Sequence, residues 1–208
     1  MLNAIILSLI LTAAGSKWID FLYKLPNAPL TFPDEILSRA KFRNPLLFLL
    51  LFVNLWNFAD VPAPLYFYLT AIIFFLSLIT FTDFEQYVIF DKMLLPFAVI
   101  GIFAAIQLNL PLADRIIATF ASGGIFYAIS VLTRGGIGGG DIKLVFVLGI
   151  WLGTKTLLDV ILAASIFGGV IAIFLILTKQ KNRTSYFAYG PYFTLTTIII
   201  LAVIKKFF

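Results

Sequence analysis

Two aspartates, Asp83 and Asp141, stand where a carboxyl group can do acid–base chemistry beside an apolar segment. Asp83 follows directly on the apolar or neutral residues 65–82, and Asp141 directly precedes another apolar run. Two carboxyl groups about 3 Å apart cannot both ionise, so they share one proton. One then acts as base on a water molecule while the other, protonated, polarises a carbonyl. Such a pair can hydrolyse a peptide bond without metal, His or Cys.

A glycine cluster comes immediately before the second aspartate. Five of the residues in Gly135–Gly140 are glycine, and each costs about 1 kcal/mol relative to Ala inside a helix. Close packing of membrane helices is one explanation, but packing motifs space small residues by four. The other is an open approach, in which the missing side chains of Gly138, Gly139 and Gly140 let an extended peptide backbone lie beside Asp141.

The apolar run after Asp141 is short. Residues 142–153 would form about 18 Å of helix, against a hydrocarbon core of about 30 Å. We therefore expect this helix to begin below the membrane surface, with Asp141 as its N-cap. An ordinary N-cap is the simpler interpretation of Asp141, and a solvated loop is the simpler interpretation of Asp83, Glu85 and Asp91. Periodicity does not separate Asp83 from Glu85.

Composition indicates an integral membrane protein. The chain has 208 residues, of which 62% are hydrophobic and 12% charged, whereas an average soluble domain is about a quarter charged. Its mean hydropathy is +1.06. The absence of Cys and His excludes thiol nucleophiles, His bases, Ser-His triads and zinc sites built from these residues. We attribute the net charge of +5 to orientation and anionic lipid, and expect no nucleic-acid partner.

The apolar residues fall into eight segments, which predict an all-α, polytopic helical bundle of about eight spans. We treat residues 1–208 as a single domain with a short cytoplasmic loop at 16–44. The segments are 2–15, 45–59, 64–82, 93–108, 112–133, 142–153, 156–178 and 190–205.

Basic residues predict the orientation. The loops at 16–44, 83–92, 134–143 and 179–189 carry 11 Lys and Arg residues, and the other side of the membrane carries 4. Cytoplasmic loops are enriched in Lys and Arg, so we place the first side, and both Asp83 and Asp141, at the cytoplasmic face.

With these residues in view, the chain resembles the type IV prepilin leader peptidases, which are membrane aspartyl proteases of the glycine-x-glycine-aspartate class. Four stretches carry the resemblance, in order and over nearly the whole chain. They are Gly15-Ser16 with Leu22-Tyr-Lys-Leu-Pro26, Thr82-Asp83 through Ile89-Phe90-Asp91, Gly138-Gly-Gly-Asp141-Ile-Lys143-Leu144, and Tyr189-Gly-Pro191-Tyr-Phe193.

The resemblance implies that Asp83 and Asp141 are the catalytic pair. It also implies the substrates, which are prepilins or pseudopilins with a short basic leader followed by an apolar helix. The location implied is the prokaryotic inner membrane, with cleavage at its cytoplasmic face. Gly138 to Gly140 and Lys143 belong to the matched motif as supporting residues. Glu85 and Asp91 would attract the basic leader.

This chain departs from the family pattern in ways that bear on methylation. Bifunctional members also methylate the new N-terminus with S-adenosylmethionine and carry paired Cys-x-x-Cys motifs in a larger first loop. Here the loop is short, contains no Cys and shows no glycine-rich cofactor cradle. We expect neither a metal nor a cofactor for proteolysis, and the sequence gives little support for S-adenosylmethionine. Phe90 also replaces the usual Pro of the first motif.

Two other functions fit some of the same features. An ion-coupled transporter would use a broken helix and its acids as a site at the midplane of the membrane. It is less consistent with this sequence, which has no inverted repeat and places its acids at one face. A catalytically inactive assembly scaffold is the third possibility. The sequence does not indicate an oligomeric state.

Overall fold

The computed structural model describes residues 2–178 and 188–204, and every regular element within these ranges is helical. This confirms the predicted all-α class. The elements are α1 (Leu2–Tyr23), η1 (Pro33–Glu35), α2 (Ile36–Arg39), η2 (Ala40–Phe42), α3 (Arg43–Asn57), α4 (Ala63–Gln86), α5 (Asp91–Gln107), α6 (Leu112–Leu132), α7 (Gly139–Leu177) and α8 (Gly190–Ile204). The predicted break at 179–183 lies outside the described residues.

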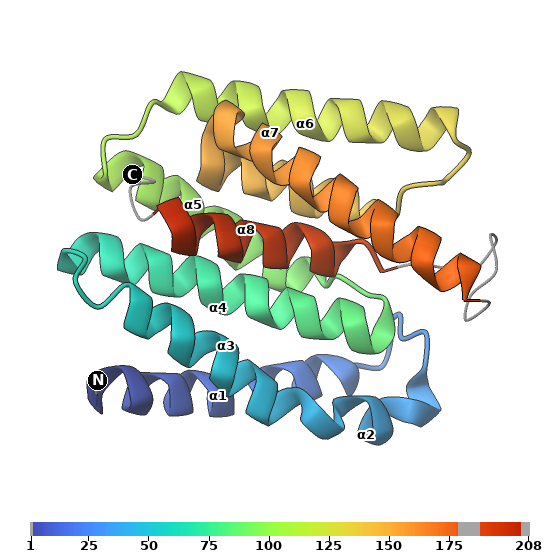
Figure 1. Ribbon diagram of the computed structural model, residues 1–208, viewed down its shortest axis with the longest axis horizontal. Coiled ribbons are helices and arrows are strands. Elements are labelled where there is room, and N and C mark those ends of the chain that lie inside the picture. Colours follow the sequence, from blue (N-terminus) through green and yellow to red (C-terminus); the bar gives the residue numbers. More distant parts are fainter. Residues whose placement is uncertain (1, 179–187, 205–208) are drawn as a thin grey trace.

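The long helices lie side by side with their axes in roughly one direction (Figure 1). The α1 and α3 helices pack together at one edge, and α6 and α7 pack together at the other. Between them, α5 and α8 each pack against both α4 and α7. The helices that carry the two aspartates, α4 and α7, are therefore linked through two intervening helices.

Four of the helices are long and apolar enough to cross a membrane. These are α1, α4, α6 and the long element α7, judged by length and composition, and α8 is a shorter apolar helix. Large apolar side chains are exposed along the outer surfaces of the bundle, for example Ile117 and Phe167. Such a surface suits lipid rather than water, and it supports a multi-pass membrane protein. Eight separate spans remain a prediction.

Two predicted helix boundaries are wrong. The first apolar segment does not end at residue 15, because α1 continues to Tyr23 and buries Ile19 and Leu22 completely. The connection to α3 is therefore shorter than the predicted loop at 16–44. At the end of α4 the helix continues to Gln86, so Asp83 lies within its last turn rather than after it.

The long element α7 is two helices joined at Gly153. This residue has φ 70° and ψ 177°, a conformation that glycine adopts at little cost, and the chain turns back there (Figure 1). At the start of the second part, the Asp114 carboxylate accepts the backbone N–H of Thr154 at 3.0 Å. Arg115 donates to the carbonyl of Ile150 at 3.0 Å, in the last turn of the first part. The N-terminus of α6 thus satisfies backbone groups on both sides of the break.

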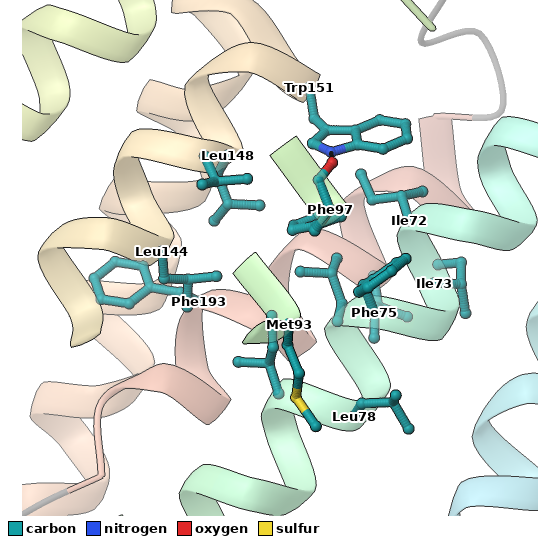
Figure 2. Packing of buried hydrophobic residues seen from close by; sticks show 14 of the residues in the cluster. Ile72, Ile73, Phe75, Leu78, Met93, Phe97, Leu144, Leu148, Trp151 and Phe193 are labelled. Carbon is teal, nitrogen blue, oxygen red and sulfur yellow. Dashed lines mark hydrogen bonds between the residues drawn. The ribbon is translucent and has the colours of Figure 1, made fainter. Parts of the chain in front are cut away.

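A stack of three aromatic rings connects α4, α5 and α7 in the centre of the bundle (Figure 2). The ring of Phe97 stacks on Phe75 at a centroid distance of 5.4 Å and on Trp151 at 5.3 Å. The Trp151 indole N–H also donates to the Phe97 carbonyl at 3.0 Å. Aromatic pairs contribute about 0.5–1.5 kcal/mol beyond the area that they bury. The stack therefore fixes the three helices relative to one another.

The contact between α6 and α7 at Gly149 yields a prediction about stability. A Cβ atom at this position in α7 would lie 2.5 Å from the Cα of Thr119 in α6, and backbone cannot move aside as a side chain can. We expect Gly149→Ala to lower the stability by about 1–3 kcal/mol, measured by thermal unfolding in detergent. The matched control is Gly124→Ala, whose Cβ would meet nothing within 4 Å. It should be neutral or stabilise by up to about 1 kcal/mol. An unchanged midpoint for Gly149→Ala would contradict this account of the crossing.

Candidate active site

The first aspartate lies in the last turn of α4. Asp83 is only 5% exposed, and its backbone carbonyl accepts the N–H of Tyr87 at 2.9 Å. Tyr87 ends the helix in a left-handed conformation with φ 53°. The chain then turns sharply towards α5, so that Val88 and Ile89 lie beside the aspartate as walls of the same cavity.

The second aspartate lies in the first turn of α7. The helix begins at Gly139, so the expectation that Asp141 is the N-cap is wrong, because the glycines before it join the helix. Gly138 takes the position before the first helical residue. A Cβ atom there would lie 3.1 Å from Oδ2 of Asp141, so the carboxylate is folded back over a residue that has no side chain.

The fold brings the two aspartates together at one cavity. The cavity has a volume of about 240 Å3, and both aspartates line it. Oδ2 of Asp83 and Oδ1 of Asp141 are buried and have no hydrogen-bond partner among the described residues. Buried polar atoms are nearly always paired, so two orphaned oxygens in one cavity indicate a functional site. The lining residues are Asp83, Tyr87, Val88, Ile89, Gly138, Gly139, Gly140 and Asp141.

Glycines leave the space around both acids. A Cβ atom at Gly190, the first residue of α8, would lie 2.6 Å from Oδ2 of Asp83. One at Gly140 would lie 3.1 Å from Cβ of Ile89, whereas one at Gly139 would meet nothing within 4 Å. Gly138, Gly139 and Gly140 all line the cavity, and their role in supporting the site stays a prediction. Gly190 was missed as a site residue, although its place before Pro191 in the last motif was a signal for it.

Glu85 does not face this cavity, and the structure corrects its predicted role. Its side chain is 1% exposed and forms a bidentate ion pair with Arg43, at 2.8 Å and 2.6 Å. Tyr23 donates a further hydrogen bond at 3.0 Å, and Arg43 also reaches Asp20 at 2.6 Å. A buried carboxylate that is already neutralised cannot attract a basic leader from solution. The pair instead joins α1, α3 and α4 directly behind Asp83.

The segment between α1 and α3 is attached to the same end of α4. The Gln86 side chain binds both backbone groups of Phe32, accepting its N–H at 2.9 Å and donating to its carbonyl at 3.1 Å. The Arg39 guanidinium lies 3.5 Å from the centroid of the Phe32 ring and donates to the Glu85 carbonyl at 3.3 Å. None of these contacts was predicted, and the hydrogen bonds among them join residues 46 or more positions apart in the sequence.

Asp91 and Lys143 are found together, but on the surface beside the cavity. The Lys143 ammonium lies 2.8 Å from both carboxylate oxygens of Asp91, and both side chains are more than half exposed. Asp91 begins α5, and Lys143 follows Asp141 by two residues in α7. The ion pair therefore connects the start of α5 to the helix that carries Asp141, and its exposure keeps the contribution of this pair to stability to about 1 kcal/mol or less.

The arrangement suits acid–base chemistry by two carboxyl groups. Of the three acids at positions 83–91, only Asp83 has a side-chain oxygen that lacks a partner among the described residues, since Glu85 binds Arg43 and Asp91 binds Lys143. Asp141 likewise keeps one free oxygen. Two carboxyl groups with free oxygens in one cavity can share a proton and hold a water molecule between them.

Comparisons with known proteins point to one family. The family model described as "Type IV leader peptidase family" matches residues 70–173, which include Asp83 and Asp141. The chain is similar to the prepilin leader peptidase/N-methyltransferase of Aeromonas salmonicida (strain A449), with 32% identity over 129 residues, 59% of this chain and 44% of that protein.

Two further relatives are also prepilin leader peptidase/N-methyltransferases. In Neisseria gonorrhoeae the identity is 33% over 132 residues, 61% of this chain and 45% of the relative. In Escherichia coli (strain K12) the identity is 30% over 133 residues, which cover 61% of this chain and 59% of the relative. The chain thus spans about half the length of the curated relatives that it matches. A comparison with solved structures finds no match.

The buried Arg43–Glu85 pair yields a second prediction about stability. Removing one partner leaves an uncompensated buried charge, so Arg43→Met should destabilise the protein by about 3–5 kcal/mol. Replacing both residues, with Arg43→Met and Glu85→Met, should recover most of that loss. Thermal unfolding of the two single variants and the double variant forms the cycle that measures the coupling.

The control for this cycle is Glu35→Gln, which breaks the exposed pair with Arg39. It should change the stability by less than about 1 kcal/mol. A double variant as unstable as the sum of its single changes would mean that the ion pair is not what couples the two positions.

Proposed function

The chain belongs to the type IV leader peptidase family, and we propose that it is a membrane aspartyl endopeptidase with Asp83 and Asp141 as its catalytic pair. The observation that carries this proposal is the cavity shared by the two acids, in which each has a buried oxygen without a partner among the described residues. Both acids fall within the part of the chain that the family model matches.

The proposed reaction starts with one proton on the pair and a water molecule between the two carboxyl groups. The ionised carboxylate takes a proton from the water as its oxygen attacks the carbonyl carbon, and the protonated carboxyl group gives its proton to the carbonyl oxygen. When the C–N bond breaks, the first group protonates the leaving nitrogen and the second recovers a proton from the hydroxyl. The pair again holds one proton, which belongs to both residues rather than to either.

The N-terminus of α7 would stabilise the negative charge that develops on the carbonyl oxygen. The first N–H groups of a helix have no intrahelical partners, and Gly138 has no side chain that could accept them. Together with the helix dipole, these groups favour negative charge at this end. The small residues at Gly139 and Gly140 leave room for an extended peptide backbone beside Asp141.

We propose prepilins or pseudopilins as the substrates, cut between a short basic leader and the apolar helix that follows it. The names of the curated relatives support this class. The excess of Lys and Arg on the side that holds Asp83 and Asp141 supports a cytoplasmic active site in the inner membrane of a prokaryote. Both acids lie within one turn of a helix end, which favours a peptidase over a transporter with acids at mid-membrane.

We propose cleavage without methyl transfer. The names of the relatives include N-methyltransferase, an activity that needs a methyl donor such as S-adenosylmethionine. Residues 24–42 of this chain contain no glycine that could form a close-fitting cradle. The backbone of Phe32 is already bound by Gln86, and the Phe32 ring is covered by Arg39. These residues do not fit the donor, so no step of the proposed reaction uses it.

The catalytic pair is tested by replacing each aspartate with its amide. Asp83→Asn and Asp141→Asn should each lower prepilin cleavage by about 100- to 10,000-fold, because one shared proton requires two carboxyl groups. Cleavage is followed on a gel that resolves precursor from product. Asp34→Asn, a change at an exposed acid, is the matched control and should cleave normally. Normal cleavage by a folded Asp83→Asn or Asp141→Asn variant would remove that residue from the pair.

The absence of methyl transfer is tested by mass spectrometry of the product. Wild-type protein incubated with a prepilin and S-adenosylmethionine should release a product that lacks the leader and has a free amino terminus. A product heavier by one methyl group would contradict the proposal on methylation and leave the peptidase assignment in place.

A further inference from the structure

An apolar groove runs along the outside of the bundle between α5 and α6. Both helices pack on α7, and the first part of α7 forms the floor between them. One section of the groove has a volume of about 490 Å3 and is lined by residues such as Leu95, Gly124 and Val147. A second section of about 400 Å3 continues past Ile102. Phe120 and Phe146 line both sections. The two sections therefore form one continuous groove, which we call the α5–α6 groove.

The α5–α6 groove begins beside the acid cavity. Its first section is lined by Asp91, Ile142 and Lys143, whereas the cavity is lined by Ile89 and Asp141 on the same two segments. On each of these two segments, one residue lines the cavity and a residue one or two positions later lines the groove. The only charged side chains in the first section are those of the Asp91–Lys143 ion pair at this end, and the rest of that section is apolar.

The dimensions of the groove suit a helix. From Asp91 to Ile106, both of which line it, α5 rises about 22 Å. Gly123 and Gly124 line the α6 side, and a Cβ atom at Gly124 would meet nothing within 4 Å. Small residues of this kind let two membrane helices approach closely.

We propose that the α5–α6 groove binds the apolar helix that follows the cleavage point of the substrate. This inference rests on the proposed function, which requires the start of that helix to lie close to Asp141. The groove meets this requirement, since it starts at Lys143 and runs away from the acids along α5. The groove is charged at the end that holds the Asp91–Lys143 pair and apolar along the rest of its first section. This order matches the order in the substrate, where a basic leader is followed by an apolar helix.

Another apolar hollow provides a contrast. It has a volume of about 440 Å3 and is lined by residues of α3, α4 and α8, including Val53, Phe84 and Leu195. No residue of α7 lines it, so it is not continuous with the segment that carries Asp141. Lipid is the ordinary occupant of such a hollow, and the α5–α6 groove differs from it because Ile142 and Lys143, which follow Asp141 in α7, line its first section.

The test fills the groove without disturbing the fold. Gly124→Leu places a side chain in open space within the groove, and the matched control Gly169→Leu makes the same change on the second part of α7. A Cβ atom at Gly169 also meets nothing within 4 Å, and Gly169 lines neither the groove nor the cavity. Each variant is assayed on a full-length prepilin and on a peptide that contains the leader and cleavage point but lacks the apolar helix.

We expect Gly124→Leu to raise the KM for full-length prepilin at least five-fold, with kcat little changed. Its activity on the peptide should equal that of the wild type, and Gly169→Leu should match the wild type on both substrates. An unchanged KM for full-length prepilin would overturn the groove proposal, and so would an equal loss on both substrates. Failure of the wild type to cleave prepilin would instead overturn the proposed function.

Photocrosslinking gives a second measurement that does not require cleavage. Benzoylphenylalanine replaces Phe120 in the groove or, as the control, Phe167 on the second part of α7; the two side chains are similarly exposed, at 66% and 58%. In the Asp141→Asn background, uncut prepilin should crosslink at position 120 and not at position 167. Crosslinks to lipid alone at position 120, or equal prepilin crosslinks at both positions, would overturn the proposal.

Discussion

The rest of the structure depends on one constraint, which is that two carboxyl groups lie at one cavity, each with a buried oxygen that has no partner among the described residues. Unpaired buried polar groups are costly, so the surrounding helices must hold them there. The α5 and α8 helices do this by packing against both α4 and α7. The stack of Phe75, Phe97 and Trp151 fixes the register, because Phe75 lies eight residues before Asp83 and Trp151 ten residues after Asp141. These separations correspond to about 12 Å and 15 Å of helix, which places both acids at nearly the same height.

Charge compensation around the cavity distinguishes the two acids of the proposed catalytic pair from their neighbours. The sequence offers three acids within positions 83–91, and pattern alone does not separate them. In the structure Glu85 is neutralised by Arg43 inside the bundle, and Asp91 binds Lys143 on the surface. Only Asp83 is left to face Asp141. The neighbouring acids therefore stabilise the frame around the site, and their partners keep additional uncompensated charge away from it.

The sequence predicts those parts of the fold and site that depend on local signals. Continuous apolar runs predict helices, and the charged and glycine-rich breaks predict that Asp83 and Asp141 lie near helix ends. Contacts between distant residues leave no such signal. The Arg43–Glu85 pair joins residues 42 positions apart. In the sequence alone, Arg43 is not distinguished from the other basic residues of the predicted loop. The charges of Lys17 and Asp20 likewise suggest a loop, although Ile19 and Leu22 continue α1 into the core.

Glycine has a different physical role at each of four positions that shape the acid cavity and its surroundings. At Gly153 it allows the backbone angle that divides α7, so the helix that carries Asp141 is short and its N-terminus lies at the acid cavity. At Gly149 it lets α6 approach α7 to backbone contact, and at Gly190 it leaves room for the Asp83 carboxylate. At Gly124 it opens the α5–α6 groove. A bulkier residue at Gly149 would press on the backbone of α6, and one at Gly190 would press on the Asp83 carboxylate, whereas one at Gly124 would only occupy the groove. Glycine therefore serves both to let the helices pack closely around the acids and to leave the α5–α6 groove open beside them.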